Sequence, residues 1–332
     1  MKYRKLGRTG LLVSEVCLGT MTFGNQIDEA TSINLIKWAV DHGVNFIDTA
    51  DLYVEGKTEQ IVGKALKGMR DQVVLATKAG AWKSGPTVND IGLSRKFIMK
   101  CVEDSLRRLD VDSVDVYYAH KPESVTPIDE TLRAMDDLVR QGKVRHIACS
   151  NFWSWQLAKS LWMSDKLNLA RFECIQPPYN LLVRDIEQEL LPFCASESVG
   201  VAVFNPLAAG LLTGKHDPAK APEKSTRFSN ALLGKVYYAR YWQDANFGAV
   251  GKIKELCQKS GKSMAQFALA WILKNPAITS VICGSNSVKQ LEENLGAVEL
   301  KVTPEEIAVC DEIWNQLHPP RFAYGSQQTV RS

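Results

Sequence analysis

The 332-residue sequence lacks the features of several protein classes. Its eight cysteines are scattered, with no Cys-x-x-Cys pair and no histidine at ligand spacing, so neither a zinc site nor a disulfide framework is expected. No apolar run approaches the ~20 residues that span a bilayer. No dense block of lysine and arginine occurs, and the net charge of +3 is small for this length. We therefore expect no metal, no membrane association and no nucleic-acid partner.

The first seven residues also lack the features of a secretory signal. Basic residues are present there, but no apolar segment follows them. The hydrophobic fraction of 45% and the charged fraction of 23% are those of an ordinary globular protein, and they allow a large buried core. Several cysteines stand in apolar runs, as small core residues do. We expect a protein of the reducing cytoplasm.

Short β-branched runs alternate with longer segments of helical periodicity, a pattern typical of repeated βα units. Asp28 and Ser94 are predicted to cap two of the helices, and Pro127 to occupy the first position of a third. No GxGxxG motif follows the first strand, which argues against an open Rossmann sheet. We predict an α/β protein of one domain spanning residues 1–332, a single (β/α)8 TIM barrel. Its eight strands are expected to begin near Val16, Asn45, Val73, Val114, Val144, Glu173, Val199 and Ser280.

Three segments lie outside these eight units. Residues 1–14 are interpreted as an N-terminal β-hairpin around the turn Gly7-Arg-Thr-Gly10. Thr303-Pro-Glu-Glu306 is a capping box that opens an extra C-terminal helix, so residues 303–332 are expected to form a helix and a tail. Residues 216–247 are the long irregular segment, and loops of that length inside compact domains are usually functional.

Four polar residues, Asp48, Tyr53, Lys78 and His120, each follow an apolar, strand-like run. In a parallel barrel the carboxyl ends of the strands meet at one mouth, where such folds carry their chemistry. A tyrosine hydroxyl protonates a carbonyl oxygen well only if its pKa, ~10 when unperturbed, is lowered by a nearby cation. Lys78 would supply that cation, Asp48 would hold the ammonium, and His120 would hydrogen-bond the substrate oxygen. Singly, each has an ordinary structural explanation; together they predict a catalytic tetrad.

The sequence around these residues resembles that of the aldo-keto reductases. The matching segments are Asp48-Thr-Ala-Asp-Leu-Tyr53, Ala76-Thr-Lys78 and Tyr118-Ala-His120. The resemblance implies an NADP(H)-dependent oxidoreductase that interconverts a carbonyl (aldehyde, ketone or keto-sugar) and an alcohol, with Tyr53 as general acid and base. It points to the branch that includes bacterial sugar and aldehyde reductases and the potassium-channel β-subunits.

Further segments resemble the cofactor site of that family. The resemblance implies that Ser150 and Asn151 hold the nicotinamide amide, although serine and asparagine also favour turns and helix caps. Phe204 replaces the usual stacking tyrosine and keeps its aromatic face. The loop 216–247 is expected to lie over the cleft. The implied cofactor contacts are Gly19, Thr20, Met21, Asp48, Ser150, Asn151, Gln176, Phe204, Asn205, Pro206, Leu207, Gly210, Leu211, Lys215, Arg227, Gly284, Asn286, Gln290, Glu293 and Asn294.

The turn from Gly284 to Asn294 resembles the part of the family that reads the 2′-phosphate of the cofactor. Many members place a cation early in that turn, whereas this chain has the neutral Asn286 and Ser287. A helix N-terminus still favours an anion there, although Ser287 with Gln290 also forms a plain capping box. We expect NADP(H) to be preferred by a modest margin, with NAD(H) as the alternative cofactor.

The substrate is expected to be a small carbonyl or alcohol in an aromatic-lined pocket suited to sugar rings or aryl carbonyls. A second hypothesis is a cofactor-sensing regulatory or binding subunit like the potassium-channel β-subunits. His120 favours turnover, because the channel-associated relatives carry asparagine at that position. The oligomeric state, including a homo-oligomer, is left open. The substrate residues that we predict are Met21, Phe23, Tyr53, Trp82, His120, Phe152 and Trp153.

Overall fold

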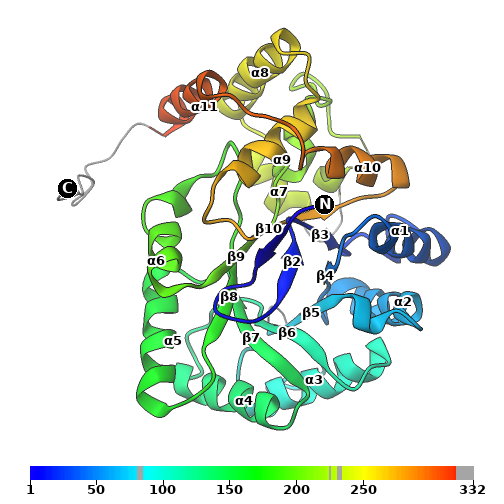
Figure 1. The fold of residues 1–332 in the computed structure, drawn as a ribbon, viewed down its shortest axis with the longest axis vertical. Helices are drawn as coiled ribbons and strands as arrows, with labels where there is room; N and C mark the ends of the chain where they lie inside the picture. The colour runs from blue at the N-terminus through cyan, green and yellow to red at the C-terminus, as the bar shows by residue number, and fades with distance from the viewer. Residues whose placement is uncertain (81–84, 224–225, 230–233, 319–332) are drawn as a thin grey trace.

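Eight parallel strands close into a barrel in the computed structural model, which describes residues 1–80, 85–223, 226–229 and 234–318 (Figure 1). Around the barrel the strand order is β10-β3-β4-β5-β6-β7-β8-β9. The predicted (β/α)8 barrel is therefore confirmed, and each strand begins at or next to its predicted residue. The strands are β3 (Val16–Gly19), β4 (Phe46–Asp48), β5 (Val74–Ala79), β6 (Val114–Ala119), β7 (Val144–Ser150), β8 (Phe172–Gln176), β9 (Gly200–Val203) and β10 (Ser280–Gly284).

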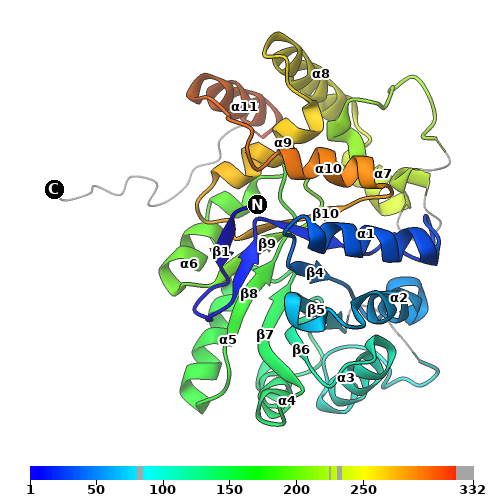
Figure 2. The ribbon, with the colours of Figure 1, turned by 45° about the vertical axis from the view of Figure 1, so that its right-hand side comes forward.

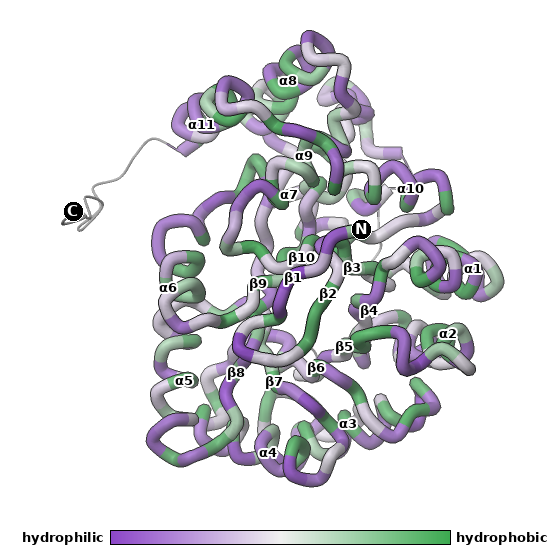
Figure 3. The backbone as a smooth tube through the Cα atoms, viewed as in Figure 1, coloured by the Kyte–Doolittle hydropathy of each residue, from purple (hydrophilic) through white to green (hydrophobic). Residues whose placement is uncertain are grey.

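Helices surround this barrel (Figures 1 and 2), and both hydrophilic and hydrophobic positions occur along them (Figure 3). The α-helices are α1 (Glu29–Asp41), α2 (Lys57–Leu66), α3 (Arg95–Leu109), α4 (Ile128–Arg140), α5 (Ser154–Leu167), α6 (Leu190–Glu197), α7 (Gly234–Tyr241), α8 (Asp244–Lys259), α9 (Met264–Lys274), α10 (Val288–Gly296) and α11 (Pro304–Leu317). Short 3-10 turns are η1 (Tyr53–Gly56), η2 (Arg70–Gln72), η3 (Asp185–Glu187), η4 (Ala208–Thr213) and η5 (Arg227–Ser229).

Most predicted helix starts are confirmed. Asp28 accepts a hydrogen bond from Thr31 N at 2.7 Å, and Ser94 caps α3. The capping box of Thr303 and Glu306 opens α11, the predicted extra helix. The predicted position of Pro127 is wrong by one residue, because Pro127 occupies the N-cap of α4 and not the first helical position. Its fixed φ of −57° suits either position, so the proline marks the boundary only to within a residue.

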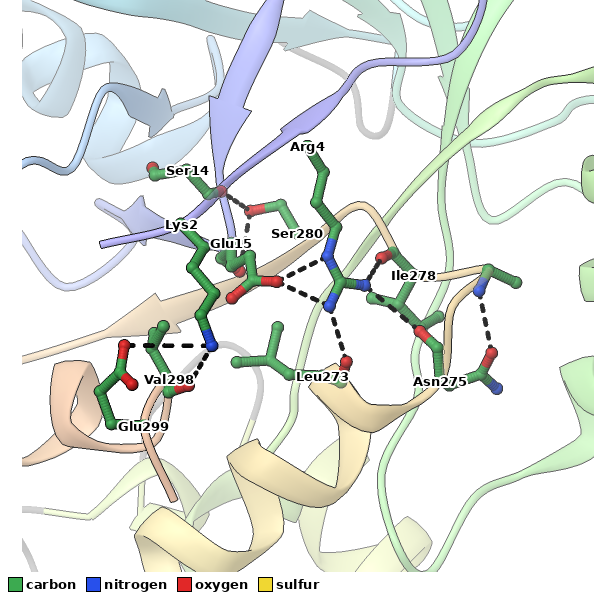
Figure 4. A network of polar contacts seen from close by, with 11 residues as sticks. Lys2, Arg4, Ser14, Glu15, Leu273, Asn275, Ile278, Ser280, Val298 and Glu299 are labelled. Carbon is green, nitrogen blue, oxygen red and sulfur yellow. Dashed lines mark hydrogen bonds and ion pairs between the residues drawn. The ribbon is translucent and has the colours of Figure 1, made fainter. Parts of the chain in front are cut away.

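The predicted N-terminal hairpin is confirmed as β1 (Tyr3–Lys5) paired antiparallel with β2 (Leu12–Ser14). It covers the amino ends of the strands: a Cβ on Gly7 would lie 2.1 Å from the Glu173 carbonyl, a close approach that only glycine allows. Arg4 fixes the hairpin to the rest of the fold (Figure 4). Its guanidinium donates to Glu15 at 2.7 Å and to the carbonyls of Leu273 and Ile278 at 2.8 and 2.5 Å, which satisfies the end of α9.

The segment 216–247 is not wholly irregular, which corrects our prediction. Its described part contains η5, α7 and the first turn of α8. Trp242 lies at the centre of an aromatic cluster with His216, Phe228, Tyr238 and Phe247, at centroid distances from 4.9 to 5.5 Å. The helix α7 was missed because it is only eight residues long and begins with a glycine, which has a low helix propensity. A helix this short is stabilised by its packing against the rest of the fold more than by its own sequence.

Candidate active site

The register of the barrel strands aims the predicted site residues at the barrel mouth. Side chains along a barrel strand alternate between the interior and the surrounding helices. The apolar cluster that fills the interior includes Phe46, Ala76, Tyr118, Ala148 and Cys174. Two positions after each of these residues, and therefore on the same face, stand Asp48, Lys78, His120, Ser150 and Gln176. A packed apolar floor thus carries a polar layer directly above it.

Lys78 and Asp48 form a buried ion pair at the centre of this layer. Lys78 Nζ donates to Asp48 Oδ2 at 2.5 Å and to the Thr49 carbonyl at 2.8 Å. The two side chains are 1% and 3% exposed. Burial acts to lower the pKa of Lys78, but Asp48 and Tyr53 together act against it, and the net pKa is raised. The ammonium therefore stays charged, and its position is set by two acceptors.

Tyr53 lies beside this ion pair in η1, just after β4. The Lys78 ammonium is 5.2 Å from the centroid of its ring. Burial raises the pKa of Tyr53, and Lys78 lowers it only in part, so the net pKa is above the usual value. Our expectation of a lowered pKa is therefore wrong for this structure, because the cost of burying a phenolate exceeds the stabilisation by the ammonium. Tyr53 consequently keeps its proton across the physiological range.

The backbone after Tyr53 is held in an uncommon conformation. Val54 and Glu55 have φ of 48° and 54°, which place both in the left-handed region. A β-branched residue there is a clear outlier, and such strain clusters at functional sites. Gly56 follows at φ 86° and opens α2. The strained turn brings the ring of Tyr53 to 6.3 Å from that of His120, in an edge-on arrangement.

His120 is held through its backbone. Its N–H donates to the Ala79 carbonyl at 2.8 Å, and its carbonyl accepts from Asn151 Nδ2 at 2.9 Å. Burial and the charges of Lys78 and Lys121 lower the pKa of the imidazole well below its usual value, so the ring is neutral. Its Nδ1 atom is buried and has no hydrogen-bond partner in the part of the chain that the structure describes.

Two cavities meet above these residues. The inner compartment, about 360 Å³, lies over the tetrad, and the outer compartment, about 370 Å³, extends toward α10. Both are lined by Asn205, Arg227 and Gly284, so they form one cleft. The inner compartment is otherwise lined by Gly19, Thr20, Met21, Asp48, Leu52, Tyr53, His120, Lys121, Ser150, Asn151, Gln176, Phe204, Val236, Tyr237, Arg240 and Ile282.

The outer compartment has the chemistry of an anion site. Lys215 and Arg227 line it, and neither has a carboxylate within ion-pair distance among the described residues. A Cβ on Gly284 would lie 2.7 Å from the Arg227 guanidinium, so glycine gives the cation its place. The remaining lining residues are Thr22, Gln26, Pro206, Leu207, Ala209, Gly210, Thr213, Thr226, Ser263, Ala265, Cys283, Asn286, Gln290, Glu293 and Asn294.

Side chains within the cleft also order its walls. Asn205, at φ 59°, accepts from Ala209 N at 2.8 Å and donates to the Tyr241 hydroxyl at 2.8 Å. At the other end, Ser287 caps α10, while Gln290 Oε1 accepts from Asn286 N at 2.8 Å. The predicted capping box therefore forms only on the serine side. The amide of Gln290 closes the turn one residue earlier and still lines the outer compartment.

The structure brings nearly all of the predicted cofactor residues to this cleft. Leu211 is the exception, since it is fully buried and lines neither compartment. Of the predicted substrate residues, Met21, Tyr53 and His120 line the inner compartment. Phe23 is fully buried, Phe152 lines a different pocket beside α5, and Trp153 is 69% exposed. Trp82 lies outside the described residues.

Several lining residues were missed from the sequence. Val236, Tyr237 and Arg240 lie on α7, and the position of Arg240 one helical turn after the other two was the available signal. Lys121 stands next to His120, and Gln26 belongs to the loop after β3. In the described part of the chain no helix is long and apolar enough to cross a membrane, and no group of His, Cys, Asp and Glu is placed to hold a metal ion.

The sequence is similar to a known protein family and to several known proteins over most of its length. The sequence profile described as "Aldo/keto reductase family" matches residues 15–315. A probable voltage-gated potassium channel subunit beta of Arabidopsis thaliana is 37% identical, over 90% of this chain and 92% of the relative. The uncharacterized oxidoreductase YrpG of Bacillus subtilis is also 37% identical, over 95% and 96%. Versiconal hemiacetal acetate reductase of Aspergillus parasiticus is 32% identical, over 96% and 99%.

Proposed function

The chain belongs to the aldo/keto reductase family, and we propose that it is an NADP(H)-dependent oxidoreductase that interconverts a carbonyl and an alcohol. The observation that carries this proposal is the contact of a protonated Tyr53 with the buried Lys78–Asp48 pair at the floor of the cleft. An acid that keeps its proton is what carbonyl reduction requires at the oxygen. The substrate class is an aldehyde, a ketone or a keto-sugar.

Each residue of the tetrad would have one task. The nicotinamide, when bound, supplies or accepts the hydride. Tyr53 gives its hydroxyl proton to the carbonyl oxygen, and Lys78 stabilises the tyrosinate that forms. Asp48 fixes the ammonium. The neutral imidazole of His120 orients the substrate oxygen through a hydrogen bond, since one of its ring nitrogens carries a proton.

The residues of the outer compartment fit a dinucleotide phosphate. Lys215 and Arg227 would hold phosphate oxygens, for which guanidinium and ammonium groups are suited. Ser150, Asn151 and Gln176 offer amide and hydroxyl groups at the inner end. The neutral Asn286 and Gln290 support a modest preference for NADP(H) over NAD(H), because neutral donors recognise a phosphate less strongly than arginine does.

We also propose that residues 1–332 act as one domain, in the reducing cytoplasm. The contacts of Arg4 with the end of α9 join the hairpin to the barrel. All eight cysteines are free and buried, as in a chain that does not depend on disulfides.

A panel of aldehydes, ketones and sugars, assayed with each reduced cofactor by the absorbance of that cofactor, tests the proposal. We expect saturable turnover with at least one carbonyl and a higher kcat/KM with NADPH. Tight cofactor binding without turnover of any carbonyl would favour a second candidate function, a cofactor-sensing subunit. That candidate rests on the similarity to potassium channel subunits beta. Absence of cofactor binding would overturn both.

A further inference from the structure

We propose that the substrate of this site carries an anionic group, a carboxylate or a phosphate, and that Arg240 binds this group. The inference rests on the proposed carbonyl-reducing function and narrows its substrate class. It departs from the aromatic-lined pocket that the sequence predicted, because Phe23, Phe152 and Trp153 do not line the inner compartment.

The inner compartment has an excess of positive charge. Its charged lining residues in the described part of the chain are Asp48, Lys121, Arg227 and Arg240. The charge of Asp48 is already compensated by Lys78 at 2.5 Å. The imidazole of His120 is neutral and adds no further charge. Arg227 and Arg240 have no carboxylate within ion-pair distance among the described residues, so these two side chains present positive charge to the compartment. A cleft lined by one sign of charge concentrates ligands of the opposite sign.

Arg240 differs from Arg227 in the part of the cleft that it lines. Arg227 lines both compartments and adjoins Gly284, so it lies where the cofactor phosphates are expected. Arg240 lines the inner compartment alone. Within the described residues no carboxylate is within ion-pair distance of it. Its charge is thus available to a molecule that occupies the inner compartment beside Tyr53 and His120.

The helix α7 holds Arg240 in place relative to the tetrad. Arg240 lies one helical turn after Val236 and Tyr237, and all three line the same cavity. The next residue, Tyr241, is fully buried, and its hydroxyl accepts hydrogen bonds from the amides of Asn205 and Asn180 at 2.8 and 3.2 Å. The carbon at the centre of the Arg240 guanidinium is 6.0 Å from the Tyr241 ring. The arginine therefore extends from an anchored helix end.

The same helix lies close to the proton donor. Tyr237, one turn before Arg240, is buried and lines the inner compartment together with Tyr53 and His120. The helix face that carries Arg240 is thus beside the reacting position. A carbonyl bound at Tyr53 would leave an anionic substituent within the part of the cleft that this face lines.

A matched pair of aldehydes tests the proposal for carboxylates, namely 4-carboxybenzaldehyde and its uncharged methyl ester, methyl 4-formylbenzoate. A second pair, glyceraldehyde 3-phosphate and glyceraldehyde, tests it for phosphates. We expect a higher kcat/KM for the charged member of at least one pair, and the pair that responds identifies the anion. In Arg240→Gln the ratio of kcat/KM for the charged aldehyde to kcat/KM for its uncharged partner should fall by roughly tenfold or more, since loss of a hydrogen bond to a charged group has that effect. Arg240→Lys should retain part of it.

Lys235→Gln is the control, because it removes the same charge from the same helix at an exposed residue that does not line the cleft. It should leave both ratios unchanged. Equal kcat/KM for the members of both pairs, or equal ratios in Arg240→Gln and the parent, would overturn the proposal while leaving carbonyl reduction intact. Failure of the enzyme to reduce any carbonyl of the wider panel, or reduction that persists in Tyr53→Phe, would instead overturn the proposed function.

Discussion

Gln176 Nε2 donates a hydrogen bond to Asp48 Oδ1 at 2.9 Å, although the two residues end strands β8 and β4 on opposite sides of the barrel. The other carboxylate oxygen of Asp48 accepts from Lys78. Both oxygens therefore have partners, and the carboxylate can neither turn nor release the ammonium without losing one. A polar bridge across the mouth of the barrel thus fixes the position of the cation that faces Tyr53.

Tyr53→Phe should reduce carbonyl-reducing kcat/KM by ~10²- to 10⁴-fold, as loss of a positioned general acid does. Its affinity for the cofactor should be nearly unchanged, because the lost hydroxyl acts on the reacting oxygen. Steady-state kinetics and a cofactor-fluorescence titration measure the two effects. Tyr238→Phe, at a 46% exposed tyrosine, is the control and should retain full activity. Turnover of Tyr53→Phe within twofold of the parent would contradict the tetrad assignment.

Lys78→Met should abolish most activity and also destabilise the fold by about 3–5 kcal/mol, because it leaves the buried Asp48 unpaired. The double variant Asp48→Asn with Lys78→Met should recover much of that stability, since it removes the buried charge, yet it should stay inactive. Urea unfolding gives the free energies. Lys64→Met, which breaks the exposed pair with Glu29, should cost less than about 1 kcal/mol. A stable single variant would show that the pair is not buried as described.

The barrel and the four residues of the tetrad could be predicted because both follow from the sequence pattern, namely the periodicity of the apolar residues and the position of a polar residue after a strand. Alternating apolar runs predicted strands, and the polar residue after each run had to lie at the carboxyl end. The substrate wall was not predictable in this way. Phe23 and Trp153 are close to the site in sequence, but the direction of a loop side chain depends on packing that no local pattern encodes, and Phe23 turned into the core. The sign of the Tyr53 pKa shift likewise depends on how much burial opposes Lys78.

The pH profile of carbonyl reduction should be flat from about pH 6.5 to pH 10, the range bounded by the usual pKa values of histidine and tyrosine. The pKa of Tyr53 is raised, so its protonated form persists until the pH exceeds that range. The pKa of His120 is lowered, so the ring is already neutral at the lower limit. Measurement of kcat/KM against pH with one neutral aldehyde tests both. A loss of activity centred near pH 8 would show that Tyr53 has a lowered pKa after all.

Asp51 should make the fold less stable as the pH rises. It is buried without a partner for Oδ1 among the described residues, while nearby Glu59 is paired with Arg108 at 2.6 Å. Burial, followed by the charge of Glu59, raises the pKa of Asp51 to about 7. The folded state therefore binds the proton more tightly than the unfolded chain, whose aspartate pKa is ~3.9. Stability is full below about pH 4 and falls as the pH rises toward 7.

Asp51→Asn should remove that dependence and be more stable than the parent at pH 8, by on the order of 2–4 kcal/mol, with a smaller difference at about pH 5. Urea unfolding at the two pH values measures it. Asp71→Asn, at an exposed aspartate, should show no such change between them. Parallel stability curves for the parent and Asp51→Asn would mean that Asp51 is ionised without cost.

Cofactor choice should depend on the turn before α10. Gln290 lines the outer compartment, and its Oε1 already accepts from Asn286 N, which leaves its amide hydrogens for a ligand. We expect NADPH to be preferred modestly over NADH, and Gln290→Ala to lower the ratio of their kcat/KM values by roughly fivefold, the effect of a hydrogen bond of ~1 kcal/mol.

Ser287→Ala is a less direct test, because Ser287 caps α10 and its loss loosens the helix start itself. Lys289→Ala is the matched control, because Lys289 is exposed and does not line the outer compartment. If the neutral residues of the turn recognise the cofactor, the ratio of kcat/KM with NADPH to that with NADH should be the same in this variant as in the parent. A preference for NADH in the parent, or a larger change in Lys289→Ala than in Gln290→Ala, would mean that the phosphate is bound by the lysine and not by the turn.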